Sequence, residues 1–133
     1  APPLVRITSS LRAGLPAALK RRGAFHWTCL PDDARELSIL TLRVPGAGDR
    51  LSREIVGFVQ SLREQDLFKL PGISETIDWA SALVQLDKLA LDPQTVNDTL
   101  GVLLKYQDDI AKIQGSEAAK LLDQVNAELA AAR

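Results

Sequence analysis

The chain has 133 residues, 46% hydrophobic and 25% charged, which gives room for one modest domain or two small subdomains. Its 16 basic and 17 acidic residues nearly cancel, so the composition excludes the overall electrostatic field that attracts nucleic acid or an anionic membrane. We therefore expect no nucleic-acid partner, and any electrostatic function must be local.

No apolar run approaches the roughly 20 residues that span a bilayer, and no signal-like segment opens the chain. This predicts a soluble, cytoplasmic protein without a membrane span. The chain contains no methionine and opens with an apolar run, from which we expect the C-terminal part of a longer protein. Cys29 and His26 are the only residues of their types, which excludes an intrachain disulfide and a Cys/His metal cluster. We expect no metal site and a buried thiol beside a packed imidazole.

Two strands are predicted in the first part of the chain. Residues 4–8 are rich in β-branched side chains and alternate apolar with polar, and residues 25–29 supply a second strand. A short helix over residues 17–22 separates them, with Pro16 in its first turn and Gly23 at its end.

A second helix is expected after the second strand. Asp32 or Asp33 can cap it, and Pro45 stops it. Its apolar residues are Leu37, Ile39, Leu40 and Leu42. Residues 1–45 are therefore predicted to form an α/β edge of two strands with short helices, within a chain that is mainly α.

Beyond the glycines at positions 46 and 48, the hydrophobic period is helical throughout, which predicts an all-α subdomain over residues 46–133. One helix carries an inward stripe and leaves Arg53, Glu54 and Arg63 outside it. The stripe consists of Leu51, Ile55, Val59 and Leu62, with Phe58 alongside.

Three further helices are predicted from their start signals. Ser74 is a candidate cap for the first, in which Trp79 is expected to anchor the core. Asp92 followed by proline starts the second, and the stretch at Gly115 interrupts the chain before the third. The third places Ala118, Leu121, Leu122, Val125 and Leu129 on one face.

A basic cluster closes the first short helix. Lys20, Arg21 and Arg22 are adjacent, and an arginine at a subunit edge can stabilise charge on a phosphoryl group in transfer. On spacing alone, such a cluster more often complements the helix dipole. Ser9 and Ser10 follow the first strand, where a hydroxyl can orient a water or contact a phosphate, although an ordinary turn is the commoner reading.

Over roughly residues 4 to 113, the chain resembles the portion of a MoxR-type AAA+ ATPase from sensor one onward, in the branch associated with von Willebrand factor A proteins. The matching blocks in the N-terminal third are Ile7 to Ser10, Leu15-Pro16, Ala18 to Arg22, Phe25 to Trp27 and Pro31-Asp32. The later blocks are Leu62-Arg63, Leu67, Lys69 to Gly72, Glu75 to Ala80, Ala82-Leu83, Thr99 to Gly101, Leu104 to Tyr106 and Asp108.

The resemblance implies that residues 1–45 are the C-terminal part of a P-loop AAA+ core and that residues 46–133 are its helical lid. It also implies roles for six residues. Arg22 aligns with the arginine finger, Arg21 is a neighbouring second donor, and Ser10 stands where the family usually has the sensor-one asparagine. The cofactor-binding sensor-two region corresponds to Ser74, Glu75 and Thr76, and it lacks the arginine that many relatives place there.

The resemblance also implies cofactors and partners. The parent protein is expected to use ATP and Mg²⁺, to form a homo-oligomeric ring, expected as a hexamer, and to act as a chaperone. Its implied partners are a von Willebrand factor A protein and a client enzyme whose assembly or metal-cofactor maturation it supports. This chain has no phosphate-binding loop of the G-x-x-x-x-G-K-[ST] type and no strand ending in paired acids, so we expect it to be inactive alone. The alternative is a non-enzymatic helical protein-interaction module.

Overall fold

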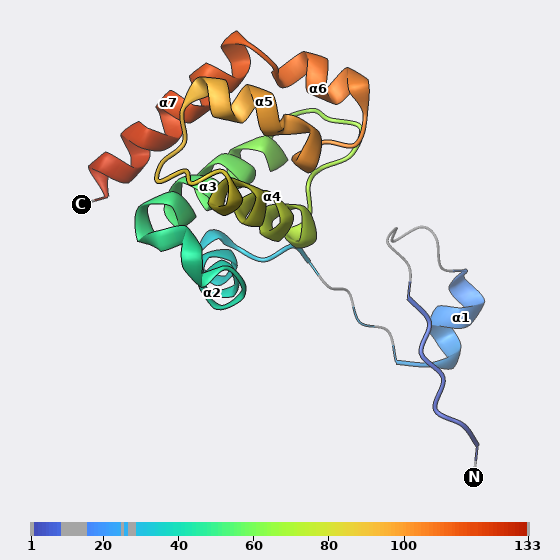
Figure 1. The fold of residues 1–133 in the computed structure, drawn as a ribbon. Coiled ribbons are helices and arrows are strands. Elements are labelled where there is room, and N and C mark those ends of the chain that lie inside the picture. The colour runs from blue at the N-terminus through green and yellow to red at the C-terminus, as the bar shows by residue number, and fades with distance from the viewer. Residues whose placement is uncertain (1, 9–15, 25, 27–28, 133) are drawn as a thin grey trace.

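The computed structural model describes residues 2–8, 16–24, 26 and 29–132. Within these residues the regular structure is helical (Figure 1). In chain order the elements are α1 (Ala17–Arg22), α2 (Asp33–Arg43), the short 3₁₀ helix η2 (Pro45–Ala47), α3 (Gly48–Arg63), α4 (Ile73–Gln85), α5 (Pro93–Leu103), α6 (Gln107–Ile113) and α7 (Ser116–Ala131).

The predicted α/β edge is wrong for the described part of the chain, which contains no strand. Residues 4–8 are irregular and exposed, and His26 and Cys29 are likewise exposed and outside any strand. The expected buried thiol is therefore wrong too, and the other residues of the second predicted strand lie outside the described residues. A strand obtains its hydrogen bonds from a neighbouring strand, which a local pattern does not supply. The mainly helical character of the prediction is confirmed.

The boundaries of three helices follow local signals. Helix α1 spans Ala17–Arg22 as predicted, with Gly23 as its C-cap, whereas Pro16 is its N-cap and not part of its first turn. Asp32 caps α2 and Asp92 caps α5, each accepting a hydrogen bond from the backbone N–H three residues further on, at 2.8 and 2.9 Å. These carboxylates satisfy donors that the first helical turn would otherwise leave unpaired.

Helix α3 lies at the centre of the core and packs against α2, α4 and α7. The Phe58 ring of α3 packs on the fully buried Trp79 of α4, with ring centroids 5.5 Å apart. The Trp79 indole N–H donates a hydrogen bond to Thr99 Oγ1 at 2.7 Å. Gly57 allows α7 to approach closely, because a Cβ at this position would lie 2.6 Å from Val125 Cγ1. The predicted stripe is confirmed, since Leu51, Ile55, Phe58, Val59 and Leu62 are all buried.

Two parts of the helical region differ from the sequence patterns. Leu40 is buried, but Leu42 is 82% exposed, because two residues turn a helix by about 200° and so place Leu42 on the face opposite Leu40.

The helix that begins at Pro93 ends at Leu103, and α6 follows after extended backbone at Leu104 and Tyr106. The sequence patterns did not separate α6 from the preceding helix.

The N-terminal segment differs from the rest in its packing. Helix α1 buries none of its residues and lies apart from the bundle of α2 to α7 (Figure 1). Helix α2 precedes the predicted division at residue 46, yet it packs against α3 and α4. The division itself stays a prediction.

Among the described residues, no helix combines the length and apolar character needed to cross a membrane.

Candidate functional site

The basic cluster lies in the last turn of α1. Arg21 and Arg22 are exposed, and among the described residues neither guanidinium makes an ion pair or a hydrogen bond. Ser10, the third predicted catalytic residue, lies outside the described residues. Both guanidinium groups are therefore exposed to solvent, and their catalytic role stays a prediction.

The predicted cofactor-binding residues lie in the first turn of α4. Its N-cap is Gly72, not Ser74 as predicted, and the Glu75 carboxylate accepts the Gly72 N–H at 3.0 Å. The buried Thr76 hydroxyl donates to the Gly72 carbonyl at 3.1 Å, and Ser74 is exposed. A carboxylate at this position complements the helix dipole and repels a phosphate. The three residues are therefore a poor fit to ATP.

A buried arginine joins three elements near this turn. Arg63, at the end of α3, places Nη2 2.7 Å from Oε2 of Glu36 in α2, and the two side chains are 7% and 0% exposed. Its Nε donates to the Pro71 carbonyl at 2.8 Å, directly before α4. Burial raises the pKa of Glu36 above its ordinary value, and the nearby Arg63 and Gln60 oppose that rise. Arg63 thus holds the start of α4 against α2, although its sequence pattern placed it outside the stripe.

A second buried carboxylate fixes the loop between α3 and α4. Asp109 of α6 is 2% exposed and accepts the backbone N–H groups of Phe68 and Lys69, at 2.9 and 3.2 Å. Lys112, one turn further along, donates to the Asp66 carbonyl. The loop is therefore anchored at several points, and it presents Phe68 outward.

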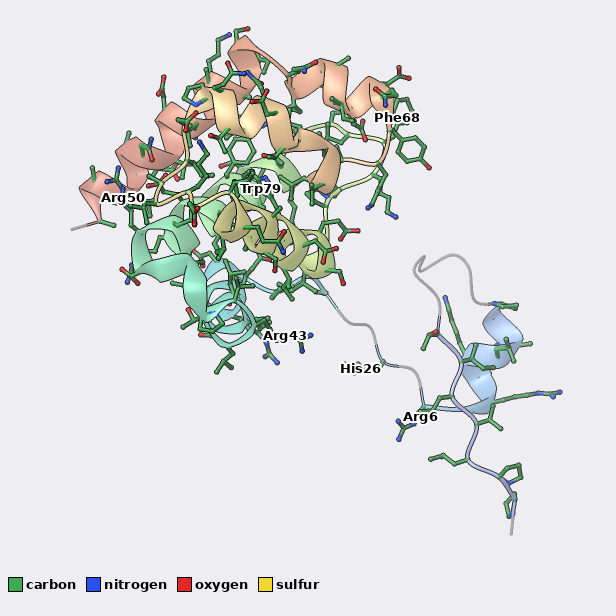
Figure 2. All side chains as sticks on the ribbon, viewed as in Figure 1. Arg6, His26, Arg43, Arg50, Phe68 and Trp79 are labelled. Atoms are coloured by element: carbon green, nitrogen blue, oxygen red, sulfur yellow. The ribbon has the colours of Figure 1, made fainter. Side chains whose placement is uncertain are left out.

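Two aromatic rings meet at this loop. Phe68 is 77% exposed and Tyr106 is 53% exposed, with ring centroids 6.1 Å apart and planes inclined by 50°. Figure 2 shows the ring of Phe68 projecting from the surface. Because Leu70 is exposed on the same loop, the region combines apolar area with a fixed backbone.

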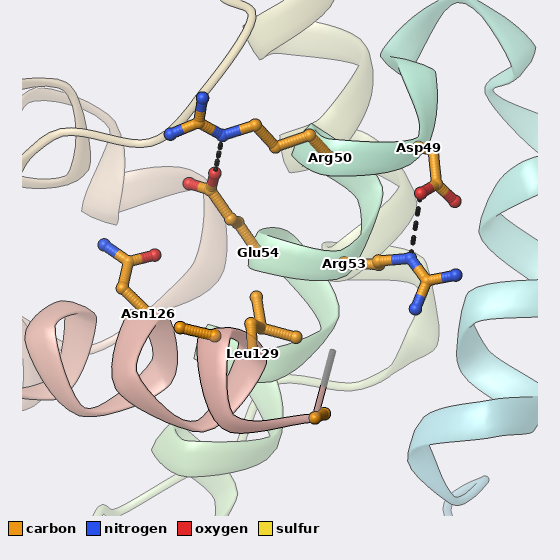
Figure 3. A pocket seen from close by; sticks show the side chains of 8 residues that line it. Asp49, Arg50, Arg53, Glu54, Asn126 and Leu129 are labelled. Atoms are coloured by element: carbon orange, nitrogen blue, oxygen red, sulfur yellow. Dashed lines mark hydrogen bonds and ion pairs between the residues drawn. The ribbon is translucent and has the colours of Figure 1, made fainter.

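An open groove of about 640 Å³ lies between the start of α3 and the end of α7 (Figure 3). Arg50 pairs with Glu54 and Arg53 with Asp49, each at 2.9 Å, so the two cations face two carboxylates. The second oxygen of Glu54 accepts the Leu91 N–H at 2.8 Å, which explains why a residue expected on the outer face is buried. With its charges paired, the groove has no excess charge to select an ionic ligand. It is lined by Asp49, Arg50, Arg53, Glu54, Asn126, Leu129, Ala130 and Ala132.

The described residues contain no group of three or more His, Cys, Asp or Glu side chains placed to hold a metal ion. Helix α1, which carries the two arginines, lies apart from α4 (Figure 1). The sequence patterns did not identify Glu36 and Asp109 as buried carboxylates, because each is an acidic residue at an ordinary position of a helix.

Neither a protein-family model, nor a curated protein, nor a solved structure matches the chain.

Proposed function

We propose that the chain is the C-terminal portion of a MoxR-type AAA+ ATPase that couples ATP hydrolysis to the assembly or metal-cofactor maturation of a partner protein. In this role α1 supplies an arginine finger to the nucleotide of a neighbouring subunit, and the helices that follow form the lid. A von Willebrand factor A protein and a client enzyme are the proposed partners.

The observation that carries this proposal is the state of α1. The helix has six residues and buries none of them, while Leu19, Arg21 and Arg22 are exposed. Isolated helices of this length are marginal in water because nucleation is costly. A neighbouring subunit would cover the apolar side chain, and the phosphoryl group would receive the guanidinium groups.

The contacts within the bundle support the proposed lid. Two hydrogen bonds join blocks that carry the resemblance, one between Arg63 and Pro71 and one between Trp79 and Thr99. The blocks therefore act together in a single helical body. Since the first turn of α4 fits ATP poorly, the finger is the better supported contribution to nucleotide chemistry.

ATP turnover by the full-length protein tests the proposal. Arg22→Ala is expected to lower the rate by about 10³ to 10⁵, the range for loss of an arginine finger, while nucleotide binding persists. Arg43→Ala, which removes an exposed arginine from the last turn of α2, serves as the matched control and is expected to leave the rate unchanged. Equal turnover by the Arg22 variant and the control would contradict the finger assignment.

A non-enzymatic helical interaction module is the second candidate function. It is favoured by the exposed rings of Phe68 and Tyr106 on an anchored loop, which need no nucleotide to be presented. This alternative predicts that the oligomeric state of the full-length protein is indifferent to ATP, as measured by sedimentation. Rings that form only with ATP would exclude it.

A further inference from the structure

We propose that Phe68, Lys69, Leu70, Lys105 and Tyr106 form a docking surface, here called the aromatic platform, for an acidic segment of a partner protein. The segment would place one apolar side chain on the two rings and its carboxylates beside the two lysines. The proposal does not depend on ATP hydrolysis, because none of these residues has a proposed role in nucleotide chemistry.

The aromatic platform is fixed before any partner arrives. The Asp109 carboxylate accepts the N–H groups of Phe68 and Lys69, and Arg63 holds the carbonyl of Pro71. Immobilising a loop on binding costs free energy, and a loop that is already fixed avoids much of that cost.

The apolar part of the platform has the chemistry of a binding anchor. The rings of Phe68 and Tyr106 are 77% and 53% exposed, with centroids 6.1 Å apart, and Leu70 adds to the exposed area. Aromatic residues dominate the energetically important positions of protein interfaces, because they bury a large area with few rotatable bonds. The tyrosine also keeps a hydroxyl for a polar contact at the rim.

Uncompensated positive charge indicates an acidic partner. Lys69 and Lys105 are each adjacent in sequence to one of the rings, and among the described residues neither ammonium makes an ion pair or a hydrogen bond. Asp66 lies 4.0 Å from Lys112 and is already paired, while Asp108 lies in the first turn of α6, where the helix dipole offsets its charge. Two lysines therefore remain to attract carboxylates.

The same charges disfavour nucleic acid and membrane lipid. Both are recognised through several cations acting together, whereas the platform has two lysines and no arginine. A peptide can space its carboxylates around one apolar residue, so it fits this mixture better than a polyanion.

Binding of defined peptides to the full chain tests the proposal. The probe is a labelled peptide in which glutamates surround a single phenylalanine, and two controls replace the glutamates by lysine or the phenylalanine by alanine. We expect only the probe to bind, with amide chemical-shift changes centred on residues 68–70 and 105–106. Absence of binding, equal binding of the lysine peptide, or shift changes elsewhere would overturn the proposal.

Variants locate the contribution of each part. Phe68→Ser and Tyr106→Ser are each expected to weaken the probe about tenfold or more, as for an interface anchor. The combined variant Lys69→Glu and Lys105→Glu is expected to reverse the preference toward the lysine peptide. Leu89→Ser is the control, because Leu89 is 85% exposed and belongs to another loop, and it should bind as the unchanged chain does. Circular dichroism verifies that each variant is folded.

Two other occupants are tested in the same samples. A labelled single-stranded oligonucleotide that binds more tightly than the probe, and loses binding with the lysine variants, would replace the peptide by nucleic acid. Self-association that Phe68→Ser abolishes in sedimentation would make the occupant a second copy of the chain. Either result would overturn the proposal of an acidic partner.

Discussion

Replacing Arg63 by methionine is expected to destabilise the helical bundle by about 3–5 kcal/mol near pH 7.5. The substitution keeps much of the side-chain length. It leaves the Glu36 carboxylate buried without the guanidinium group that lies 2.7 Å from it in the unchanged protein. It also removes the donor to the Pro71 carbonyl. Since domains of this size are stable by about 5–15 kcal/mol, the loss is a large part of the total.

The destabilisation by Arg63→Met should depend on pH. Burial already raises the pKa of Glu36 above 4.5, and without Arg63 that effect is opposed less, so the folded-state pKa rises further. The folded state then binds the proton more tightly than the unfolded state. The contribution of Glu36 to the free energy of unfolding is therefore present at low pH and falls as the pH rises from about 4.5 through the folded pKa.

Urea unfolding near pH 7.5 and pH 4.5 measures both effects. With an m-value of about 1–3 kcal/mol/M, the midpoint near pH 7.5 should fall by roughly 2 M. Near pH 4.5 the loss should shrink toward the cost of the bond to Pro71, about 1–3 kcal/mol.

Two comparisons accompany the methionine variant. Arg53→Met removes an exposed ion pair with Asp49 and should cost about 0–1 kcal/mol at either pH. Arg63→Lys keeps the charge without the planar fork and should fall between the two methionine variants. A cost for Arg63→Met equal to that of Arg53→Met, or the same at both pH values, would refute the reasoning.

Two further substitutions test the packing of α3. Gly57→Ala should destabilise the bundle by about 1 kcal/mol in thermal unfolding, because the overlap of the new Cβ with the Val125 methyl, 2.6 Å away, costs more than the gain in helix propensity. In a Val125→Ala background this cost should vanish. An unchanged cost in that background would contradict the assigned contact. Trp79→Phe should cost about 2 kcal/mol, since it leaves a small cavity and removes the hydrogen bond to Thr99. A Thr99→Val variant controls for the bond alone, and equal costs for the two would show that the ring volume contributes nothing.

Features that depend on neighbouring residues could be predicted from the sequence. The boundaries of α1 and the caps Asp32 and Asp92 involve one side chain and the backbone within a turn of it, so the local pattern contains the relevant interaction. The buried stripe of α3 follows from helical periodicity in the same way. The adjacent Arg21 and Arg22 at the end of α1 were predictable for the same reason.

Features that depend on distant partners could not be predicted in this way. Residues 4–8 have the composition of a strand, but a strand needs a second strand beside it, and none is present among the described residues. Glu54 and Arg63 are polar at outer positions of a helix, yet both side chains are buried. Glu54 accepts the Leu91 N–H, and Arg63 pairs with Glu36 and donates through Nε to the Pro71 carbonyl, so their partners come from elsewhere in the fold.

The sequence by itself thus determined the start of α1, α2 and α5 and the buried stripe of α3, because capping and periodicity act over a few residues. Only the tertiary structure decided which polar side chains are buried in contacts that stabilise the fold and which apolar side chains stay exposed on the surface. Phe68 and Tyr106 are far apart along the chain, and they meet because the buried Asp109 binds the backbone of one loop to α6. Such a contact exists only when the chain has folded, since burial from water gives the carboxylate its strength as an acceptor.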